Sequence, residues 1–107
     1  MDAIDLVREH FASIGLKRIE VPEWKLTVFA APMTLAEKNK LYKKSRESDM
    51  ELLVDILIMK AQDESGKKLF EIDHRLTLLN KADSNVVARV ANAILSDDAP
   101  KADELKN

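Results

Sequence analysis

The segment from residue 49 to residue 62 constrains the fold most, because it contains the longest apolar-rich window of the chain. Ser48-Asp49-Met50-Glu51 marks its start with a helix-capping pattern, and MELLVDILIM follows over residues 50–59. Charge interrupts this window, and it is far too short to span a membrane. A helix built from it is apolar over more than half of its circumference, so other elements must cover it. The pattern therefore predicts a central helix with a broad face made of Leu52, Leu53, Ile56, Leu57, Met59 and Lys60.

Size and composition limit the chain to one domain. It has 107 residues, of which 46% are apolar, enough for one folded core and too few for two ordinary domains. It contains no cysteine, which excludes disulfide bonds, thiolate catalysis and cysteine-bound zinc. Its net charge of −2 argues against a general nucleic-acid-binding protein. Asp2, Asp5 and Arg8 interrupt the first apolar residues, so no signal peptide is indicated and a cytosolic protein is the simplest interpretation.

The N-terminal third changes from a helical to an alternating pattern. Residues 2–14 are expected to form a helix that ends at Gly15. The apolar face of this helix consists of Ala3, Ile4, Val7, Phe11 and Ile14. Residues 16–32 read as two β-strands on either side of Val21-Pro22-Glu23-Trp24. Proline has no amide to donate to a sheet, so Pro22 belongs in the connection and the segment predicts a β-hairpin.

Three further helices are predicted after the hairpin, in addition to the central one. Thr34 and Glu37 form a capping box at the start of a helix over residues 35–45. A short helix over residues 71–81 is expected to direct Ile72, Leu76 and Leu79 inward. Asp83-Ser84 can cap a last helix. Its expected core-facing residues are Val86 or Val87, Val90, Ala91 and Ile94.

These segments together predict an α+β fold that is mostly helical, with four to five helices and one N-terminal β-hairpin. We expect a single domain over residues 1–96. From Ser96 onward the chain has one large apolar residue in twelve, together with a proline. Such a segment buries too little surface to offset the entropy lost on ordering, so residues 97–107 are expected to form a flexible tail.

The acidic turn at Asp63-Glu64-Ser65-Gly66 is the clearest candidate for a metal site. In a calcium loop of the EF-hand kind with Gly66 at position six, Ala61 falls at position one and Ile72 at position twelve. Both positions require oxygen ligands. A turn that ends the preceding helix, with Gly66 at positive φ, explains the same residues. The sequence therefore predicts a turn and no metal site.

No motif assembles catalytic groups. His10 and His74 are the only histidines and lack a second ligand at suitable spacing, and two glycines cannot form a phosphate-binding loop. Basic residues concentrate at Lys38, Lys40, Lys43, Lys44 and Arg46. Nearby acidic residues make this cluster typical of a solvated helix. We expect no enzymatic activity and no catalytic, cofactor-binding or metal-binding residue.

Large apolar residues close to the ends of predicted elements remain as candidates for binding. A small domain often leaves some of them uncovered, and a two-stranded hairpin has an open edge. We therefore expect contacts with another protein, or with a second copy of the chain, from Trp24, Phe29, Met33, Leu69 and Phe70.

The order of several segments resembles that of the small tail assembly chaperones of long-tailed bacteriophages. The segments are VPEW at residues 21–24, TLAEKNKLYKKS at residues 34–45, the long apolar helix, and DESGKKLF at residues 63–70. The resemblance covers residues 17–96. Members of the family often have glycine after the tryptophan, whereas this chain has Lys25, which leaves the geometry of that turn open.

The resemblance implies a non-enzymatic role in virion assembly, in the cytoplasm of the bacterial host cell. Such proteins coat the tape-measure protein, whose apolar helices would otherwise aggregate, until tail-tube subunits displace them. The resemblance also implies homo-oligomers. From charge, motifs and the short apolar window we expect no cofactor and no nucleic-acid or membrane partner. In many such phages a ribosomal frameshift near the end of the gene adds a domain that recruits the tail-tube protein.

Two alternatives stay open beside this interpretation. One is a different phage or prophage interaction module, such as a connector or a tube-associated protein, which the neighbouring genes would distinguish. The other is a small nucleic-acid-binding regulator that uses the lysine cluster, for which salt-dependent binding is the signature.

Overall fold

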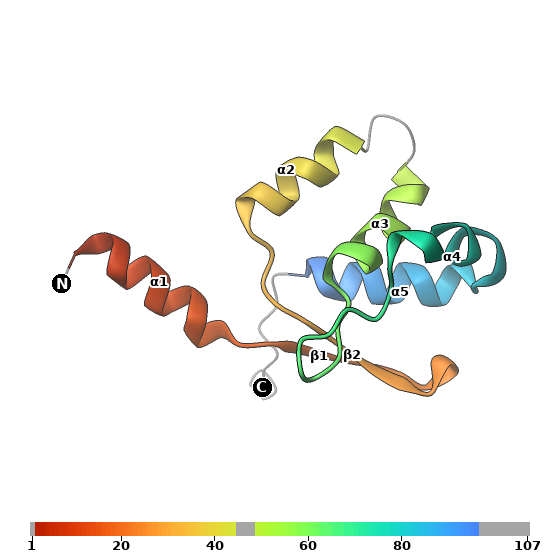
Figure 1. Cartoon of the computed structure of the whole chain (residues 1–107), viewed down its shortest axis with the longest axis horizontal. Coiled ribbons are helices and arrows are strands. Elements are labelled where there is room, and N and C mark those ends of the chain that lie inside the picture. The colour runs from red at the N-terminus through yellow and green to blue at the C-terminus, as the bar shows by residue number, and fades with distance from the viewer. Residues whose placement is uncertain (1, 45–48, 97–107) are drawn as a thin grey trace, which may run out of the picture.

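The computed structural model describes residues 2–44 and 49–96, which form five α-helices and one β-hairpin (Figure 1). In chain order the elements are α1 (Ala3–Ile14), β1 (Lys17–Val21), the 3₁₀ turn η1 (Pro22–Trp24), β2 (Leu26–Ala30), α2 (Leu35–Lys44), α3 (Asp49–Lys60), the 3₁₀ turn η2 (Ile72–His74), α4 (Arg75–Lys81) and α5 (Ser84–Leu95). The expected α+β fold, mostly helical with an N-terminal β-hairpin, is confirmed. The expected cap residue Ser48, the basic residue Arg46 and the expected tail at residues 97–107 lie outside the described residues.

Helix α3 lies at the centre of the fold, as its sequence predicts. Its residues Ile56 and Leu57 are fully buried. It packs along α5, where Val90 and Ala91 are fully buried, and it also contacts α2 and α4 (Figure 1). Because α3 has neighbours on several sides, its broad apolar face is removed from water, which is the main stabilising contribution expected for such a helix.

Two charged residues of α3 are buried as well, and each has a partner on another helix. The carboxylate of Asp55 accepts a hydrogen bond from Arg75 Nε at the start of α4, at 3.0 Å. Lys60 is only 7% exposed; its Nζ donates to Glu37 Oε1 of α2 at 2.9 Å and to the carbonyl oxygen of Pro32 at 3.2 Å. A buried charge is costly unless an opposite charge and hydrogen bonds replace water. These two ion pairs therefore restrict where α2 and α4 can lie against α3.

The β-hairpin contributes the other part of the core. Strands β1 and β2 are antiparallel, with Ile19 opposite Val28, and Val28 is fully buried. The turn η1 connects them and contains Pro22, as predicted. Lys25 follows η1 with φ 57°, in the left-handed region that favours glycine. A lysine thus occupies a position whose backbone conformation is least strained for glycine.

Two polar contacts hold the hairpin against α5. Lys17 Nζ donates to the carbonyl oxygens of Ala93, at 2.8 Å, and Ser96. A cation at this place also interacts favourably with the negative end of the helix dipole. At the other end of the hairpin, both terminal nitrogens of Arg89 donate to the carboxylate of Glu23 at 2.7 Å.

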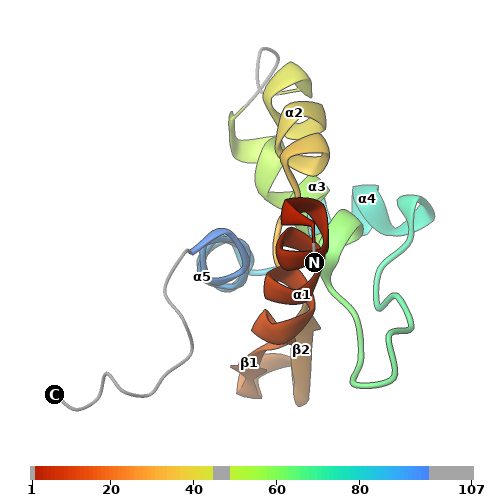
Figure 2. The same cartoon turned by 90° about the vertical axis from the view of Figure 1, so that its left-hand side faces the viewer.

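Helix α1 projects away from the rest of the molecule (Figures 1 and 2). It ends before Gly15, which has φ 73°, in agreement with the predicted stop. Only Gly15 and Leu16 connect it to β1. None of its residues is buried, so this amphipathic helix has no covered face.

The predicted orientation of α4 is wrong. Ile72 and Leu76 were expected to point inward but are 65% and 70% exposed, whereas Leu78 is 8% exposed. Leu79 packs against the core, as predicted. Residues 72–74 form a 3₁₀ turn, which winds more tightly than an α-helix, and the ion pair with Asp55 holds Arg75. The face of α4 is therefore rotated relative to an α-helix that starts at Ile72.

The two leucines of α4 test this orientation directly. We expect Leu78→Ala to lower the free energy of unfolding by about 2–4 kcal/mol, because the substitution leaves a cavity in the core. Leu76→Ala removes the same atoms from an exposed site and is expected to change stability by less than about 0.5 kcal/mol. Urea denaturation followed by circular dichroism measures both. Equal losses for the two variants would contradict the observed rotation of α4.

Candidate functional site

The acidic turn is held together by hydrogen bonds among its own residues. Asp63 Oδ1 accepts hydrogen bonds from Ser65 N, Ser65 Oγ and Lys67 N, at 2.7–3.0 Å. These hydrogen bonds lower the pKa of the Asp63 carboxyl, and the bond from the Ser65 hydroxyl has the largest effect. Gly66 has φ 96°, so the predicted glycine turn is confirmed. The carboxylate of Asp63 is occupied in shaping the turn.

The histidines also lie apart from any cluster of ligands. His74 Nδ1 accepts a hydrogen bond from Glu71 N at 2.9 Å, which caps the start of η2. Over residues 2–44 and 49–96, no group of three or more histidine, cysteine, aspartate or glutamate side chains could hold a metal ion. In the same residues, no helix combines the length and the apolar character needed to cross a bilayer.

Four of the five predicted contact residues pack against the core while remaining partly exposed. They are Trp24, Met33, Leu69 and Phe70. The structure brings Trp24, at the end of η1, against Phe70, with ring centroids 5.9 Å apart in an edge-to-face arrangement. This geometry is favoured by the charge distribution of aromatic rings and fixes both side chains. These residues thus offer some exposed surface, but they are also part of the packing.

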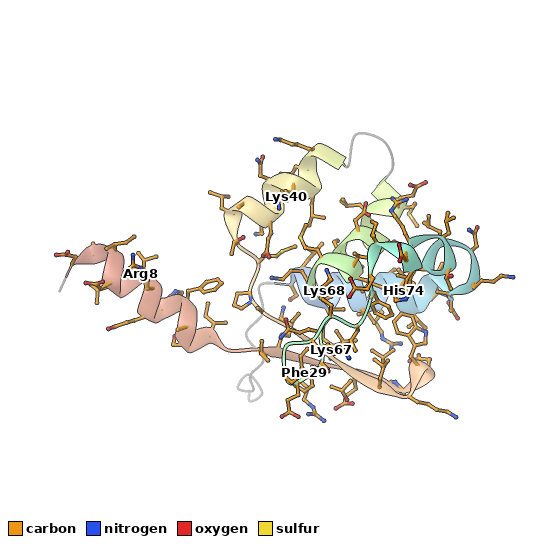
Figure 3. All side chains as sticks on the ribbon, in the orientation of Figure 1. Arg8, Phe29, Lys40, Lys67, Lys68 and His74 are labelled. Atoms are coloured by element: carbon orange, nitrogen blue, oxygen red, sulfur yellow. The ribbon has the colours of Figure 1, made fainter. Side chains whose placement is uncertain are left out.

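The fifth predicted residue, Phe29, lies at an edge of the hairpin beside the loop that carries Lys67 and Lys68 (Figure 3). Its ring is half-buried, with the guanidinium carbon of Arg18 at 5.7 Å from the ring centroid. Its backbone exchanges two hydrogen bonds with Gln62, at 2.8 and 2.9 Å. The hairpin edge that was expected to be open is therefore paired at Phe29. The role of all five residues as contacts stays a prediction.

Among the elements that the structure describes, α1 exposes the most large apolar side chains, and none of them belongs to the predicted set. Ile4, Val7, Phe11 and Ile14 recur at helical spacing on one side of the helix and are 42–60% exposed. We call these four residues the α1 stripe. Arg8 shows how the side chains of α1 stand clear of the other elements (Figure 3). An apolar stripe of this kind is typical of a helix that packs against another surface.

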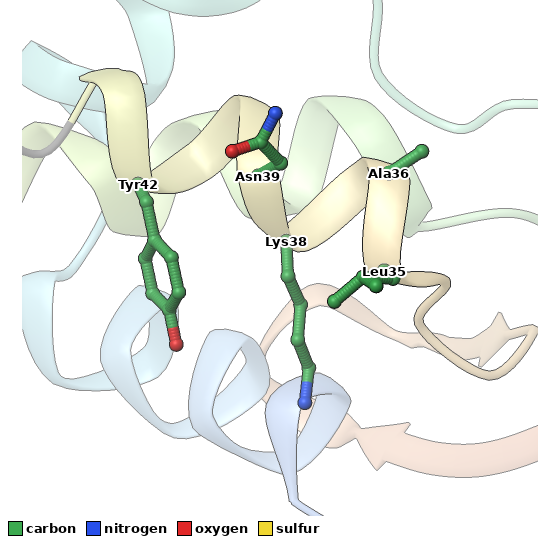
Figure 4. A pocket seen from close by; sticks show the side chains of 5 residues that line it. All are labelled: Leu35, Ala36, Lys38, Asn39 and Tyr42. Atoms are coloured by element: carbon green, nitrogen blue, oxygen red, sulfur yellow. The ribbon is translucent and has the colours of Figure 1, made fainter.

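A second apolar surface lies on α2. Leu35, Ala36, Lys38, Asn39 and Tyr42 line an open groove along the outer side of this helix (Figure 4). We call these five residues the α2 groove. Leu35 is 85% exposed, although leucine is among the residue types most often buried. The opposite side of α2 presents Leu41, which is buried in the core.

The ion pair with Lys60 sets which side of α2 faces outward. Glu37 accepts a hydrogen bond from Thr34 N at 2.9 Å, and Thr34 Oγ1 accepts one from Glu37 N at 3.1 Å, so the predicted capping box is confirmed. Burial acts to raise the pKa of Glu37, but the hydrogen bonds from Lys60 and Thr34 outweigh it and the pKa is lowered. Glu37 therefore stays charged at neutral pH and ties the first turn of α2 to the end of α3.

The predicted basic cluster borders the α2 groove. Lys38 is half-buried in the groove, and Lys40 and Lys43 are exposed on the same helix. The side chains of Lys44 and Arg46 lie outside the described residues. Because Glu37 is the one acidic residue of α2 and is paired with Lys60, the exposed surface of α2 is positively charged.

The amphipathic pattern of α1 was visible in the sequence, but its exposure was not. The sequence gives the spacing of Ile4, Val7, Phe11 and Ile14, which is equally compatible with a helix packed on its own core. Only the direction in which the chain leaves Gly15 shows that the α1 stripe is uncovered. In α2 the sequence did contain a signal: Leu35 and Tyr42 lie on the same side of the helix, whereas Leu41 lies on a different side, so only one of the two sides can face the core.

No family model, curated protein or solved structure matches this chain.

The ion pair between Glu23 and Arg89, which holds the turn that carries Trp24, is expected to make stability depend on pH. Its hydrogen bonds lower the pKa of Glu23 from 4.5 to about 2. A lowered pKa in the folded state stabilises the fold above pH 4.5, and this contribution is lost as the pH falls towards 2. We expect Glu23→Gln to melt at a lower temperature than the original chain at pH 7, and the difference to shrink by pH 2.5. A difference that stays constant across this range would contradict the assigned role of Glu23.

Proposed function

We propose that this chain is a binding protein that covers apolar helical surface on a second protein, and that its client is the tape-measure protein of a long-tailed phage. The observation that carries the proposal is the α1 stripe, four apolar side chains of one helix with no covered face. The tape measure as client rests on the sequence resemblance. A tape-measure protein is long and helical and presents apolar stripes, which are the chemical complement of α1.

The strength of such binding can be estimated from the side chains involved. Burying a half-exposed large apolar side chain contributes roughly 1 kcal/mol, so the α1 stripe contributes roughly 4 kcal/mol before the cost of association. A single copy would then bind weakly and release readily. Several copies along one client would hold it firmly in sum, and each could still be displaced by a tube subunit. Reversible shielding of a client requires weak binding by each copy together with firm binding by many copies in sum.

The surface offered by α1 suits a protein better than a lipid bilayer. Residues 2–14 carry Asp2, Asp5 and Glu9 against one arginine, Arg8. A helix that lies on an anionic membrane typically carries lysine and arginine on its polar face. The cytoplasm of the bacterial host, homo-oligomers and a frameshifted extension that recruits the tail-tube protein belong to the same proposal. The described residues do not include the end of the chain at which such an extension would join.

The proposal predicts that a gene for a long helical tape-measure protein lies beside the gene of this chain, and co-expression with that protein tests it. We expect the chain to keep that protein soluble and to co-purify with it. Phe11→Glu places a charge in the α1 stripe and is expected to weaken the complex at least tenfold, which corresponds to about 1.4 kcal/mol. The measurement is the amount of client in the soluble fraction and its Kd by calorimetry.

Ala12→Glu is the matched control, because it adds the same charge to the same helix outside the stripe. We expect this variant to bind as the original chain does. Equal binding by all three chains would contradict a role of α1 in the complex. Phe70→Glu, compared for folding and for binding, separates the predicted contact role of Phe70 from its packing against Trp24.

A further inference from the structure

We propose that the α2 groove binds the α1 stripe of a second copy of this chain, and that two copies exchange their α1 helices reciprocally. The role of this exchange as a regulator rests on the proposed function, because it covers the stripe that the client would use. The exchange itself depends only on the two surfaces described above.

The two surfaces match in length. In the α1 stripe, Ile4 and Phe11 are seven positions apart, with Ile14 one turn further. In the α2 groove, Leu35 and Tyr42 are also seven positions apart. Seven residues of α-helix rise about 10.5 Å. Large apolar side chains at both ends of each surface therefore come into register when the two helices lie side by side, in either direction.

The opposite net charges of the two helices favour α2 as the binding surface for α1. The described residues of α1 and its cap carry three carboxylates and one arginine, whereas α2 carries the half-buried Lys38 and the exposed Lys40 and Lys43. The acidic residue of α2, Glu37, is already paired with Lys60. The two helices thus carry opposite net charge, which favours their association at ordinary ionic strength. Pairing of α1 with the α1 of another copy would instead join two helices of the same net charge.

The connection at Gly15 favours a second copy over the chain's own groove. Only two residues separate α1 from β1, and β1 is fixed in the core by Ile19 and Val21. In this arrangement α1 extends away from the body (Figures 1 and 2). Another copy can reach the stripe without any rearrangement, whereas docking onto the chain's own groove requires α1 to swing about Gly15 and Leu16.

The area that each contact buries favours reciprocal exchange. A helix of 12 residues is about 18 Å long, and one of its faces covers on the order of 400 Å² of a partner. A stable interface needs about 800 Å² on each partner, twice this area. A two-fold dimer supplies it, because each copy then gives one helix and receives one. In this dimer both stripes are covered until a client competes for them.

Self-association of the full chain tests the exchange without any client. We expect a concentration-dependent dimer in analytical ultracentrifugation. Leu35→Glu, in the groove, is expected to raise the dimer Kd at least tenfold. Leu76→Glu makes the same substitution at a similarly exposed leucine of α4 and is expected to leave the dimer unchanged. A dimer that tolerates Leu35→Glu, or a chain that is monomeric at every concentration, would overturn the proposal.

Cysteine cross-linking identifies the occupant of the groove, because the chain has no cysteine of its own. Val7→Cys and Asn39→Cys place thiols near the middle of the stripe and of the groove, so they approach each other in either helix direction. Mixing the two single variants under mild oxidation is expected to give a disulfide-linked dimer of both. Val7→Cys mixed with Thr77→Cys, on α4, is the control and is expected to give none.

Other occupants give different products. A cross-link formed within one chain of the double variant Val7→Cys/Asn39→Cys, and not between chains, would show docking of α1 on its own groove. Dimers of Val7→Cys alone would show pairing of two α1 helices. Either result overturns the exchange.

Client binding separates this inference from the proposed function. Leu35→Glu, if the exchange is correct, loses the dimer and binds the client at least as well, whereas Phe11→Glu loses both. Loss of client binding with an intact dimer would assign the groove to the client and overturn the exchange. If neither the original chain nor any variant binds the client, the proposed function is wrong. The dimer measurements then decide the exchange by themselves.

Discussion

The burial of α3 against α5 is the interaction on which the other contacts depend. Ile56 and Leu57 of α3 and Val90 and Ala91 of α5 are removed from water, and their apolar surface is the main source of stability in a chain of this size. The β-hairpin packs on the same layer through Val21 and Val28. Without this layer the ion pairs of Asp55 and Lys60 would lie in water and contribute little.

The same helix also positions the elements that carry exposed surface. Lys60 holds Glu37, so α2 is fixed with Leu41 inward and Leu35 outward. Asp55 holds Arg75, so α4 is fixed with Leu78 inward and Leu76 outward. In both cases one ion pair determines which apolar residue of the helix is buried and which is exposed. The exposed apolar residues are thus a consequence of where charged partners are buried.

Helix α1 is not positioned by α3 in this way, because none of its side chains is buried. It is amphipathic, yet it is attached to the body through two residues and has no buried side chain. An apolar stripe in water is unfavourable, so its persistence in a chain of this length points to a partner. The proposed partners are a client protein and a second copy of the chain, and the net charge of α1 is opposite to that of α2. Competition between them would couple the release of the dimer to the arrival of the client.

Local features were predictable because their causes lie within a few residues. The stop at Gly15, the turn at Pro22, the capping box of Thr34 with Glu37, the cap at Asp83 and the positive φ of Gly66 were all expected and are all present. The orientation of α4 was missed because a 3₁₀ turn and a distant aspartate rotate it. The predicted contact residues Trp24 and Phe70 were recognised as large groups at element ends, but sequence could not show that they pack on each other.

The sequence by itself determined the helices and the hairpin, the central place of α3 and the absence of cysteine chemistry, because periodicity, capping and composition act locally. Only the tertiary structure decided which apolar faces are covered. Coverage depends on the direction of each element relative to all the others, and that direction is set by contacts between residues far apart in the chain, such as Lys60 with Glu37 and Arg89 with Glu23.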